Sequence, residues 1–402
     1  MNISNQLSDI LNHNQIVALK MLGDFASHIN VRAFLVGGSV RDLILGIKLK
    51  DIDVCIESEI QVFIDSIVDK DVEVISISQF ETAKIKICDE IIDLAMTRTE
   101  FYSEPAALPI VAFSDIDRDI YRRDFTINTL ALSLSSDSWG DILDTCGGMS
   151  DIKSRKIRIL YPSSFIDDPT RIFRAFKYSA RLGFEIEKIT LDSIQPDNIK
   201  NLSGVRILNE LKYIFAEDNF IKILKQLDDL DVLKSIDPNL LLPEHLLNVL
   251  SSNQLKISSY PDYGILLLAY SMASAKIRTG FSKRLDVTKN IMKAIDDIQH
   301  IEKLPVEKHS ELYYLLIGVS DLTLEMAKLY KPQSVVSQIE IFLNELKHIN
   351  LNINGEDLLN RGVSGHRVGT ILEKMKTLFL DQKVSDIRSD QISMLEQLIK
   401  ED

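Results

Sequence analysis

The sequence has 402 residues, of which 45% are hydrophobic, and a formal net charge of −13. A chain of this length predicts more than one domain, since single cores stop growing near about 300 residues. No apolar run approaches the roughly 20 residues of a membrane-spanning helix, the first residues lack the pattern of a secretory signal, and the three cysteines form no CxxC pair. These features predict a reducing, cytoplasmic environment and no membrane partner.

The first third of the chain predicts a mixed α/β fold. Residues 33–36 form a short buried strand, and Ser39 can cap a short helix that ends before Gly46. A second strand follows over 52–56, and then an amphipathic helix over 60–68. Further strands are expected over three segments, 72–77, 82–87 and 91–96. One small sheet with few helices is the expected product.

From residue 152 onward, helical periodicity replaces the strand pattern. Leu- and Ile-rich helices continue to about residue 380, separated by proline-containing breaks. The predicted fold class is therefore α+β, with a small mixed-sheet head followed by an elongated all-α region. The expected domains are a head with an N-terminal helix over 1–150, a helical neck over 151–220, a helical body over 221–345 and a helical tail over 346–402.

Basic residues are concentrated in one part of this acidic chain. Residues 151–212 contain twelve Lys and Arg against eight Asp and Glu. A local phosphate-contacting surface would have this composition, but so would a helix surface with ordinary ion pairs. Both interpretations stay open on charge alone.

Asp51 and Asp53 carry the strongest chemical signal in the sequence. In a strand, residues i and i+2 project to the same face, so the two carboxylates would lie together. A divalent cation usually compensates such repulsion, and oxygen-only ligands suit Mg²⁺. Taken alone, most Asp-x-Asp pairs are solvated turn residues. Asp93, on a later strand, could be a third metal ligand or simply a strand-end residue.

A glycine turn precedes this pair, between a strand and a helix start, where backbone N–H groups can contact phosphate oxygens. It matches neither GxxxxGK[ST] nor GxGxxG, which argues against a P-loop or a dinucleotide site. Residues 35–42 and 50–53 together resemble the first motif of the class II tRNA nucleotidyltransferase and bacterial poly(A) polymerase family. The resemblance implies a polymerase-β-like head whose catalytic and metal-binding carboxylates are Asp51 and Asp53. It also implies a nucleotide held through Gly37, Gly38, Ser39 and Arg41.

Residues 122–128, Arg-Arg-Asp-Phe-Thr-Ile-Asn, are similar to the second motif of the family. That motif is tied to ribose recognition, which implies that Arg123, Asp124 and Asn128 bind the nucleotide. Polar groups that reach the 2′-OH distinguish ribonucleotides from deoxynucleotides. Without the family resemblance, Arg-Arg-Asp would be interpreted as a surface ion pair.

Residues 167–178 resemble the family motif that reads the incoming base. A carboxylate at Asp168 can accept a hydrogen bond from the exocyclic amine of C or A, and Arg171 can donate to the adjacent ring acceptor. The alternative is a capped helix with an i,i+3 ion pair and no further role. The family has Glu-Asp where this chain has Asp-Asp, which leaves the role of Asp167 open.

The helix that continues from this motif carries further basic residues. Arg174 is expected at the nucleotide, and Lys177 and Arg181 are expected to contact RNA. Later in the chain, Arg206 and Glu210 match the last head-and-neck motif in part, and we interpret them as a helix brace rather than a substrate contact.

Residues 355–372 resemble a tail motif of the family, which implies that Gly365 and Arg367 contact RNA phosphate. A tight turn between helices is the alternative for these glycines.

The resemblance implies an enzyme that adds CCA to the tRNA 3′ end from CTP and ATP, with Mg²⁺ and without a template. Addition of A alone is an alternative, followed by CC addition or poly(A) synthesis. Residues 98–109, where the flexible loop of the family governs the switch from C to A, are present, which disfavours CC addition alone. A catalytically silent RNA-binding protein and a small-molecule nucleotidyltransferase are the alternatives from other classes. The oligomeric state is not predicted.

Overall fold

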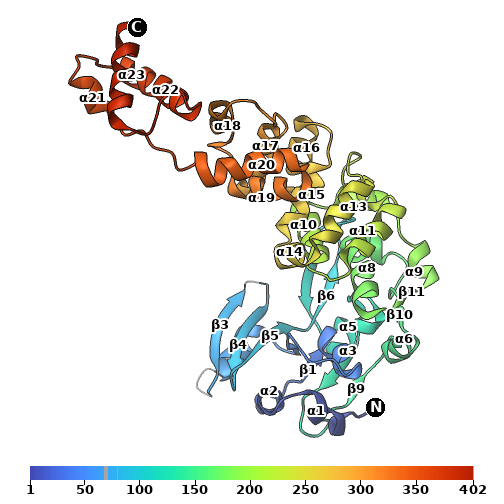
Figure 1. The fold of residues 1–402 in the computed structure, drawn as a ribbon. Helices are drawn as coiled ribbons and strands as arrows, with labels where there is room; N and C mark the ends of the chain where they lie inside the picture. Colours follow the sequence, from blue (N-terminus) through green and yellow to red (C-terminus); the bar gives the residue numbers. More distant parts are fainter. Residues whose placement is uncertain (68–70, 79, 402) are drawn as a thin grey trace. The chain divides into compact units, whose positions relative to one another are not determined.

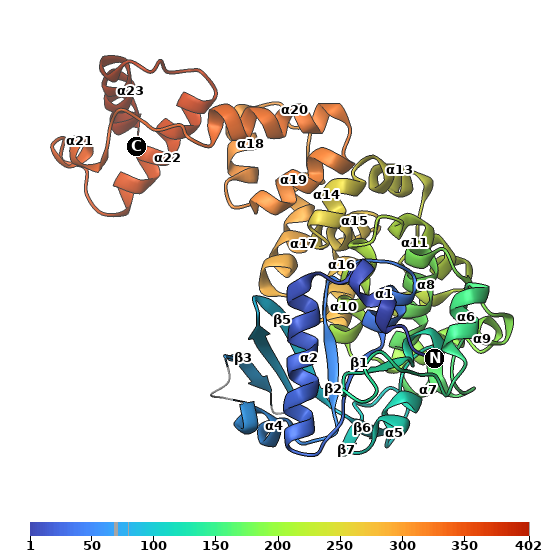
Figure 2. The same cartoon turned by 90° about the horizontal axis from the view of Figure 1, so that it is seen from below.

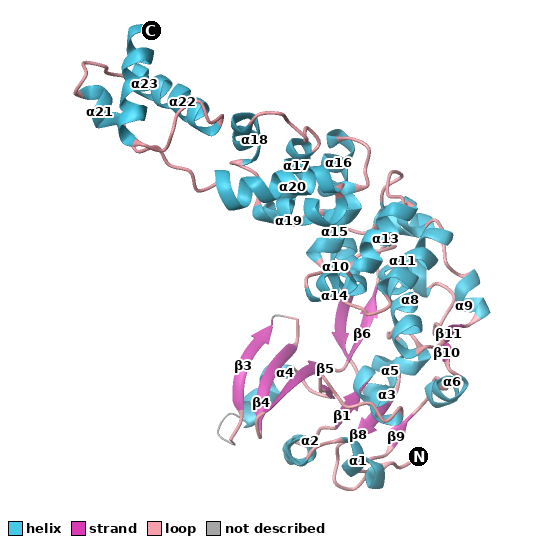
Figure 3. Cartoon of the chain, viewed as in Figure 1, coloured by secondary structure: helices cyan, strands magenta, loops and turns pink. Residues whose placement is uncertain are grey.

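The computed structural model describes residues 1–67, 71–78 and 80–401 (Figure 1). The chain divides into two compact units. The first contains residues 1–210 together with 222–235, and the second contains residues 211–221 together with the chain from residue 236 onward. Among the described residues, all strands belong to the first unit, and the second unit is helical (Figure 3). The predicted mixed-sheet head followed by a helical region is confirmed.

A mixed sheet forms the centre of the first unit. Its strand order over the described residues is β3-β4-β5-β2-β1-β8-β9, with β2 and β5 parallel and the other neighbours antiparallel. The strands are β1 (Ala33–Val36), β2 (Asp53–Ile56), β3 (Glu73–Ser78), β4 (Thr82–Ile87), β5 (Glu90–Met96), β8 (Ala131–Ser133) and β9 (Ile142–Leu143). β1 is buried throughout, as expected for a four-residue apolar strand between two neighbours.

Helices cover both faces of this sheet. α2 (His13–His28) contacts β1 and β5, and it lies beside α4 (Ile60–Ile67) across the strands (Figure 2). On the other face, α5 (Ile116–Tyr121) packs its isoleucines against Phe34 and Val36 of β1. The remaining helical segments of this part are α1 (Ser4–Ile10), α3 (Gly38–Ile44), η1 (Thr126–Asn128) and α6 (Gly148–Ser154).

A separate hairpin follows the sheet in sequence. β6 (Arg98–Phe101) pairs antiparallel with β7 (Ile110–Phe113), and residues 102–109 connect them. The segment expected to be the flexible loop is therefore the end of a two-stranded ribbon. Its connecting loop is fixed at one point, because the backbone N–H of Ala106 donates to the carbonyl of Asp167 at 3.2 Å.

Short helices and one small strand pair complete the first unit. α8 (Thr170–Leu182) begins where the Asp168 carboxylate accepts a hydrogen bond from the Thr170 N–H, and it ends at Gly183 with φ +65°. The other elements are β10 (Lys156–Ile157), α7 (Ser164–Asp167), β11 (Glu185–Ile186), α9 (Lys188–Asp192) and η2 (Pro196–Asn201). Three helices cross the division between the units, namely α10 (Gly204–Phe215), α11 (Phe220–Asp229) and α12 (Val232–Ile236).

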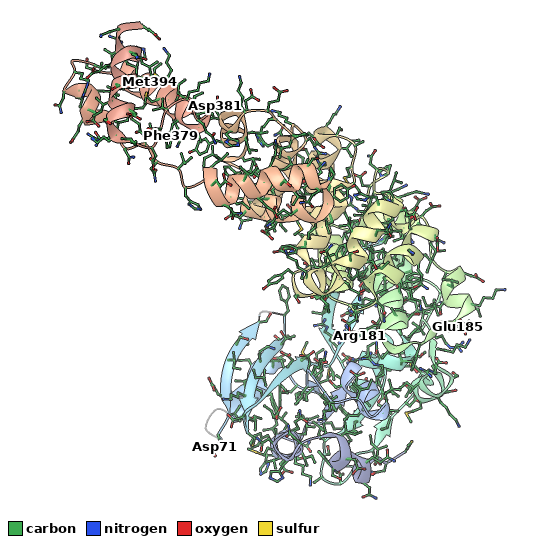
Figure 4. All side chains as sticks on the ribbon, in the orientation of Figure 1. Asp71, Arg181, Glu185, Phe379, Asp381 and Met394 are labelled. Carbon is green, nitrogen blue, oxygen red and sulfur yellow. The ribbon has the colours of Figure 1, made fainter. Side chains whose placement is uncertain are left out.

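Apolar helix packing builds the second unit. Its elements are α13 (Glu244–Ser252), α14 (Gln254–Ser259), α15 (Asp262–Tyr270), α16 (Ala275–Leu285), α17 (Lys289–Ile301), α18 (His309–Leu316), α19 (Asp321–Tyr330), α20 (Gln333–Ile341), η3 (Phe342–Leu346), α21 (Gly355–Leu359), α22 (His366–Leu380) and α23 (Arg388–Glu401). A Cβ on Gly264 would lie 2.4 Å from the Phe215 ring, so α15 packs directly on that phenylalanine. The last three helices enclose their own apolar cluster, against which Met394 packs (Figure 4). No helix over the described ranges is both long and apolar enough to cross a membrane.

The sequence-based boundaries are close to the observed ones, with one local error. β1 and β4 match their predicted ranges, and β2 begins one residue later than expected. The prediction that Ser39 caps α3 is wrong, because Gly37 occupies the N-cap position and Ser39 lies inside the helix. Val68 and Asp402, at which two predicted segments end, lie outside the described residues. The division into head, neck, body and tail stays a prediction.

Candidate functional site

A cavity of about 800 Å³ opens in the first unit, within the range of small-molecule sites. Most of the predicted site residues line it, although they come from distant parts of the sequence. They are Gly37, Gly38, Asp53, Asp93, Arg123, Asp124, Asn128, Asp168, Arg171 and Arg174. Asp51, Ser39 and Arg41 are not among its lining residues, but each lies next to one that is.

Three carboxylates gather at the start of β2. Asp53 is the first residue of that strand, and it pairs in register with Asp93 of the parallel strand β5. Asp51 lies two residues earlier, with the buried Ile52 between them. Burial raises the pKa of Asp53, and the negative charges of Asp93 and Asp51 raise it further. The structure therefore concentrates negative charge at one edge of the cavity.

Ser39 organises this edge from within α3. Its hydroxyl accepts a hydrogen bond from the Asp53 N–H at 3.2 Å and lies 3.4 Å from the Asp53 carboxylate. It also lies 3.2 Å from the carbonyl oxygen of Asp51. Ser39 thus holds the backbone of the Asp-x-Asp segment rather than the start of its own helix.

Lys84 supplies a positive charge beside the carboxylates. It faces Asp93 across the antiparallel β4/β5 pair, and its Nζ lies 2.8 Å from Asp93 Oδ1. A hydrogen bond from this ammonium to Asp93 raises the pKa of Lys84. Lys84 could not be identified from the sequence, because its relation to Asp93 depends on strand pairing that periodicity alone does not reveal.

This donor set fits a hard cation that is only partly held by protein. The donors are oxygens, and burial together with the negative charges of Asp93 and Asp51 raises the pKa of Asp53. Over the described ranges, no group of three or more Asp, Glu, His or Cys side chains is arranged to hold a metal ion by itself. Mg²⁺ commonly takes one or two carboxylates and fills its remaining positions with water and substrate phosphates. Asp51 and Asp53, with Asp93 beside them, suit that mode.

The glycine turn is constrained from two sides. Gly37 has φ +64°, a conformation that side chains with a Cβ rarely adopt. A Cβ at this position would also lie 2.8 Å from Nη1 of Arg123. Arg123 is itself fixed by Asp119, whose carboxylate lies 2.7 Å from its Nη2. The turn and the second motif therefore pack on each other at the cavity wall.

A chain of hydrogen bonds joins the second motif to both neighbouring helices. Asp124 Oδ2 lies 2.6 Å from the Arg174 guanidinium, and Asp124 Oδ1 accepts from Asn128 at 2.9 Å. Asn128 in turn accepts from Arg41 at 2.7 Å. Burial alone would raise the pKa of Asp124, but the Arg174 charge and the two hydrogen bonds outweigh it and lower the pKa to about 2.

Tyr178 lies between the two arginines of this chain. Its ring centroid is 5.2 Å from the Arg41 guanidinium and 5.6 Å from that of Arg174. Both distances fall within the range of cation–π attraction. These contacts form a largely buried network that fixes α3, η1 and α8 together, and not the surface ion pair that was the alternative interpretation.

Asp168 and Arg171 both line the cavity, but they do not pair with each other in the described structure. Arg171 donates to the Ser164 hydroxyl at 2.7 Å and to the Arg122 carbonyl at 2.8 Å. Asp168 Oδ1 accepts from Arg206 at 2.6 Å. The predicted brace between Arg206 and Glu210 is wrong, because the Arg206 guanidinium bridges Asp168 and the Ala106 carbonyl instead. The neighbouring sequence, including Val205, does not indicate that Arg206 contacts these distant residues.

The β6–β7 hairpin forms another wall of the cavity. The sequence predicted a flexible loop in this region but not the two paired strands. Glu100 pairs with Arg122 at 2.9 Å, and the Tyr102 hydroxyl donates to Glu100 at 3.0 Å. Arg122 also pairs with the fully buried Asp119 at 2.8 Å. The charges of Arg123 and Arg122 lower the pKa of Asp119 although burial opposes them.

The remaining predicted RNA contacts are scattered. Lys177 is buried, and its Nζ lies 3.9 Å from Glu210. Arg181 is exposed at the end of α8 (Figure 4). Gly365 is the N-cap of α22, with the exposed Arg367 in its first turn, and both belong to the second unit.

Two family models match this chain. Residues 33–158 match the poly A polymerase head domain. Residues 183–242 match the probable RNA and SrmB-binding site of polymerase A. The first range contains all the predicted residues from Gly37 to Asn128, and the second contains Arg206.

Comparisons that span most of this chain agree with these matches. The chain is 31% identical over 397 residues to an A-adding tRNA nucleotidyltransferase of Geobacter sulfurreducens, covering 91% of this chain but only 45% of that protein. The chain thus spans about half the length of the curated relatives it matches first. A solved CCA-adding enzyme in an apo form has a TM-score of 0.78 and 27% identity, covering 100% of this chain and 99% of the other. The Thermotoga maritima CCA-adding enzyme complexed with tRNA has a TM-score of 0.70 and 26% identity, covering 99% of both chains.

Proposed function

This chain belongs to the tRNA nucleotidyltransferase and poly(A) polymerase head family, and we propose that it adds CCA to the 3′ end of tRNA from CTP and ATP without a template. The observation that carries the proposal is that Asp53 and Asp93 line the same cavity as Asp168 and Arg171. A nucleotide in this cavity would place its triphosphate near the first pair and its base near the second.

The carboxylates of Asp51, Asp53 and Asp93 suit the transfer of a nucleotide from a triphosphate. A bound Mg²⁺ supplies positive charge to the α-phosphate and to the pyrophosphate leaving group, and it makes the attacking 3′-hydroxyl more acidic. Asp51 and Asp53 would hold this ion, and Asp93 is the third candidate ligand. Ser39 keeps the Asp53 backbone in place, and we assign the first-turn N–H groups of α3 to the triphosphate.

The opposite end of the cavity suits selection of C and A. The hydrogen bonds that the described residues make to the Asp168 carboxylate all go to Oδ1. Oδ2 is therefore available to accept from the exocyclic amine of C or A, and Arg171 can donate to the adjacent ring nitrogen. U and G present a carbonyl where Asp168 needs a donor, so they are disfavoured.

The network around Asp124 suits the sugar between these ends. Asp124, Asn128 and Arg174 form one wall and are fixed by each other. A preorganised wall holds the nucleotide without ordering cost at the moment of binding. We assign it the positioning of the ribose, and we assign Arg41 and Arg123 the support of this wall and of the glycine turn.

Addition of A alone is the second candidate function. The Geobacter sulfurreducens relative carries the name of an A-adding enzyme, whereas the solved structures carry the name of CCA-adding enzymes. The cavity has the same acceptor and donor for either base, so it favours neither candidate.

Incorporation of labelled CTP and ATP separates these functions. The purified protein is incubated with Mg²⁺ and with three tRNAs, which end at the discriminator base, at C and at CC. CCA addition predicts C incorporation on the first two and A incorporation on the third. Incorporation of A alone, only on the CC-ended tRNA, would establish the A-adding enzyme. Absence of incorporation on all three would overturn the enzymatic proposal and favour an RNA-binding protein.

A further inference from the structure

A second cavity, of about 500 Å³, adjoins the first. Glu100, Tyr102 and Arg122 line both cavities, so these three side chains form the partition between them. All lining residues of the second cavity belong to the first unit. The assignments made above to CTP, ATP and Mg²⁺ leave this space without a role.

Exposed aromatic rings border the second cavity. The side chain of Phe101 is 67% exposed and that of Tyr121 is 55% exposed, although both types usually gain stability by burial. Tyr161 contributes a third ring, and its hydroxyl is bonded to Arg171 at 3.1 Å. Aromatic faces in an open groove are the surfaces on which proteins stack unpaired bases.

One of the two arginines that line this cavity has no acidic partner among the described residues. The Arg122 guanidinium is neutralised by Glu100 and Asp119. The exposed Arg118 guanidinium has no ion pair and no hydrogen-bond acceptor within residues 1–67, 71–78 and 80–401. A single free guanidinium matches one backbone phosphate, whereas a free triphosphate would call for several positive charges.

Asp167 gives the cavity a preference among bases. It lines the second cavity, whereas Asp168 lines the first. The backbone of Asp167 is fixed by its hydrogen bond from Ala106. A carboxylate accepts from the amine of C or A and finds no such donor on the matching edge of U. The two neighbouring aspartates can therefore select amino-bearing bases on the two sides of the partition.

We propose that the second cavity binds an unpaired nucleotide of the RNA strand that is being extended. The base stacks on Phe101 and Tyr121, its amine contacts Asp167, and its phosphate contacts Arg118. This inference rests on the proposed function, because it takes the RNA 3′ end as the substrate. It assigns the strand to this cavity because the cavity adjoins the nucleotide site and offers charge for one phosphate.

Steady-state kinetics with a CC-ended tRNA test this proposal. Phe101→Ala and Arg118→Ala should each raise the KM for tRNA by about tenfold, with little change in kcat or in the KM for ATP. Arg118→Ala should also flatten the dependence of tRNA binding on salt, because one phosphate contact is lost. Phe101→Trp retains an aromatic face and should restore the KM for tRNA.

Phe80→Ala is the matched control, because Phe80 is 63% exposed and lines neither cavity. It should leave both KM values unchanged. Equilibrium binding of the same tRNA, labelled with a fluorophore, should show the same losses without catalysis. If wild type extends tRNA and both alanine variants keep its KM for tRNA, the second site is refuted while the proposed function stands. If wild type neither binds nor extends tRNA, the proposed function itself fails.

Competition with free CMP separates the two sources of a nucleotide. CMP in excess should compete with ATP equally in wild type and in Phe101→Ala, because it enters only the first cavity. CMP that displaces tRNA from wild type and loses this effect in Phe101→Ala would overturn the assignment to the RNA strand in favour of a free nucleotide.

Discussion

The two units of this chain bury charge very differently. In the first unit, the buried charged residues include Arg41, Asp119, Asp124, Arg171 and Lys177, and two of them, Asp124 and Arg171, line the large cavity. In the second unit, the described buried charges are Arg278 and Asp297, and apolar helix packing dominates. Buried charges are costly and persist only when they are paired. The first unit therefore depends on paired buried charges for its stability more than the second unit does.

A substitution at the Asp53 carboxylate should have the largest effect on nucleotide incorporation. Asp53→Asn removes a charge from the proposed metal site but keeps its size and its backbone contact with Ser39. We expect nucleotide incorporation to fall on the order of a thousandfold, because metal assistance contributes several kcal/mol to the transition state. Binding of labelled tRNA should remain near that of wild type. Retained turnover would contradict the metal role of Asp53.

Removal of one buried charge from each unit tests whether such charges serve stability alone or also function. Asp124→Ala leaves the Arg174 guanidinium and Asn128 without their partner, and Arg278→Ala removes a side chain that is 1% exposed and bound to Glu302 at 2.7 Å. Each should lower the free energy of unfolding by about 3 kcal/mol. Only Asp124→Ala should also raise the KM for ATP.

The sole tryptophan makes these two effects separable. Trp139 belongs to the first unit, so its fluorescence follows the unfolding of that unit. Asp124→Ala should shift the fluorescence transition in urea, whereas Arg278→Ala should shift the helical circular dichroism and leave the fluorescence transition in place. Equal fluorescence shifts in both variants would show that the units unfold together.

Acid should weaken the first unit through Asp124. Its pKa is lowered to about 2 in the folded protein, against about 3.9 in an unfolded chain. The carboxylate therefore contributes its stability above about pH 4 and loses it as the pH falls toward 2, a change of about 2 kcal/mol. Urea unfolding of Trp139 between pH 5 and pH 2 measures it. In Asp124→Asn this component of the pH dependence should be absent; an unchanged slope would refute it.

Glycine substitutions should give the smallest difference between the two units. Gly37→Ala should lower the free energy of unfolding of the first unit by about 1–2 kcal/mol, because φ is +64° and the new Cβ would meet Arg123. It should also raise the KM for ATP, since the turn lines the cavity. Gly369→Ala in α22 is the control, because its Cβ meets nothing within 4 Å. That change should be neutral or stabilising by about 0.5–1 kcal/mol.

Local signals in the sequence predicted much of the first unit. Residues 33–36 are apolar between polar neighbours, and they form β1. The alternation around Ile52 predicted that Asp51 and Asp53 share a face; Asp51 lies before β2 in the structure, and its negative charge raises the pKa of Asp53. These features depend on residues close in sequence, so periodicity and motif spacing are enough to predict them.

Contacts between distant segments could not be predicted in this way. Lys84 reaches Asp93 only because β4 and β5 pair in one particular register. Spacing of four residues on a helix predicted a pair between Arg206 and Glu210. In the structure, Arg206 binds Asp168, which is 38 residues away in the sequence. Helical spacing describes which residues share a face but not which distant group that face meets.

The interleaved course of the chain limits how the protein can be dissected. The shortest segment that contains the whole first unit ends at Ser235, and it necessarily includes residues 211–221 of the second. Such a fragment would carry Phe215 without Gly264, on which it packs. A gene fragment that encodes only the first unit would therefore yield an aggregation-prone product with an uncovered phenylalanine. Transfer of the first unit between proteins by a single recombination junction is disfavoured for the same reason.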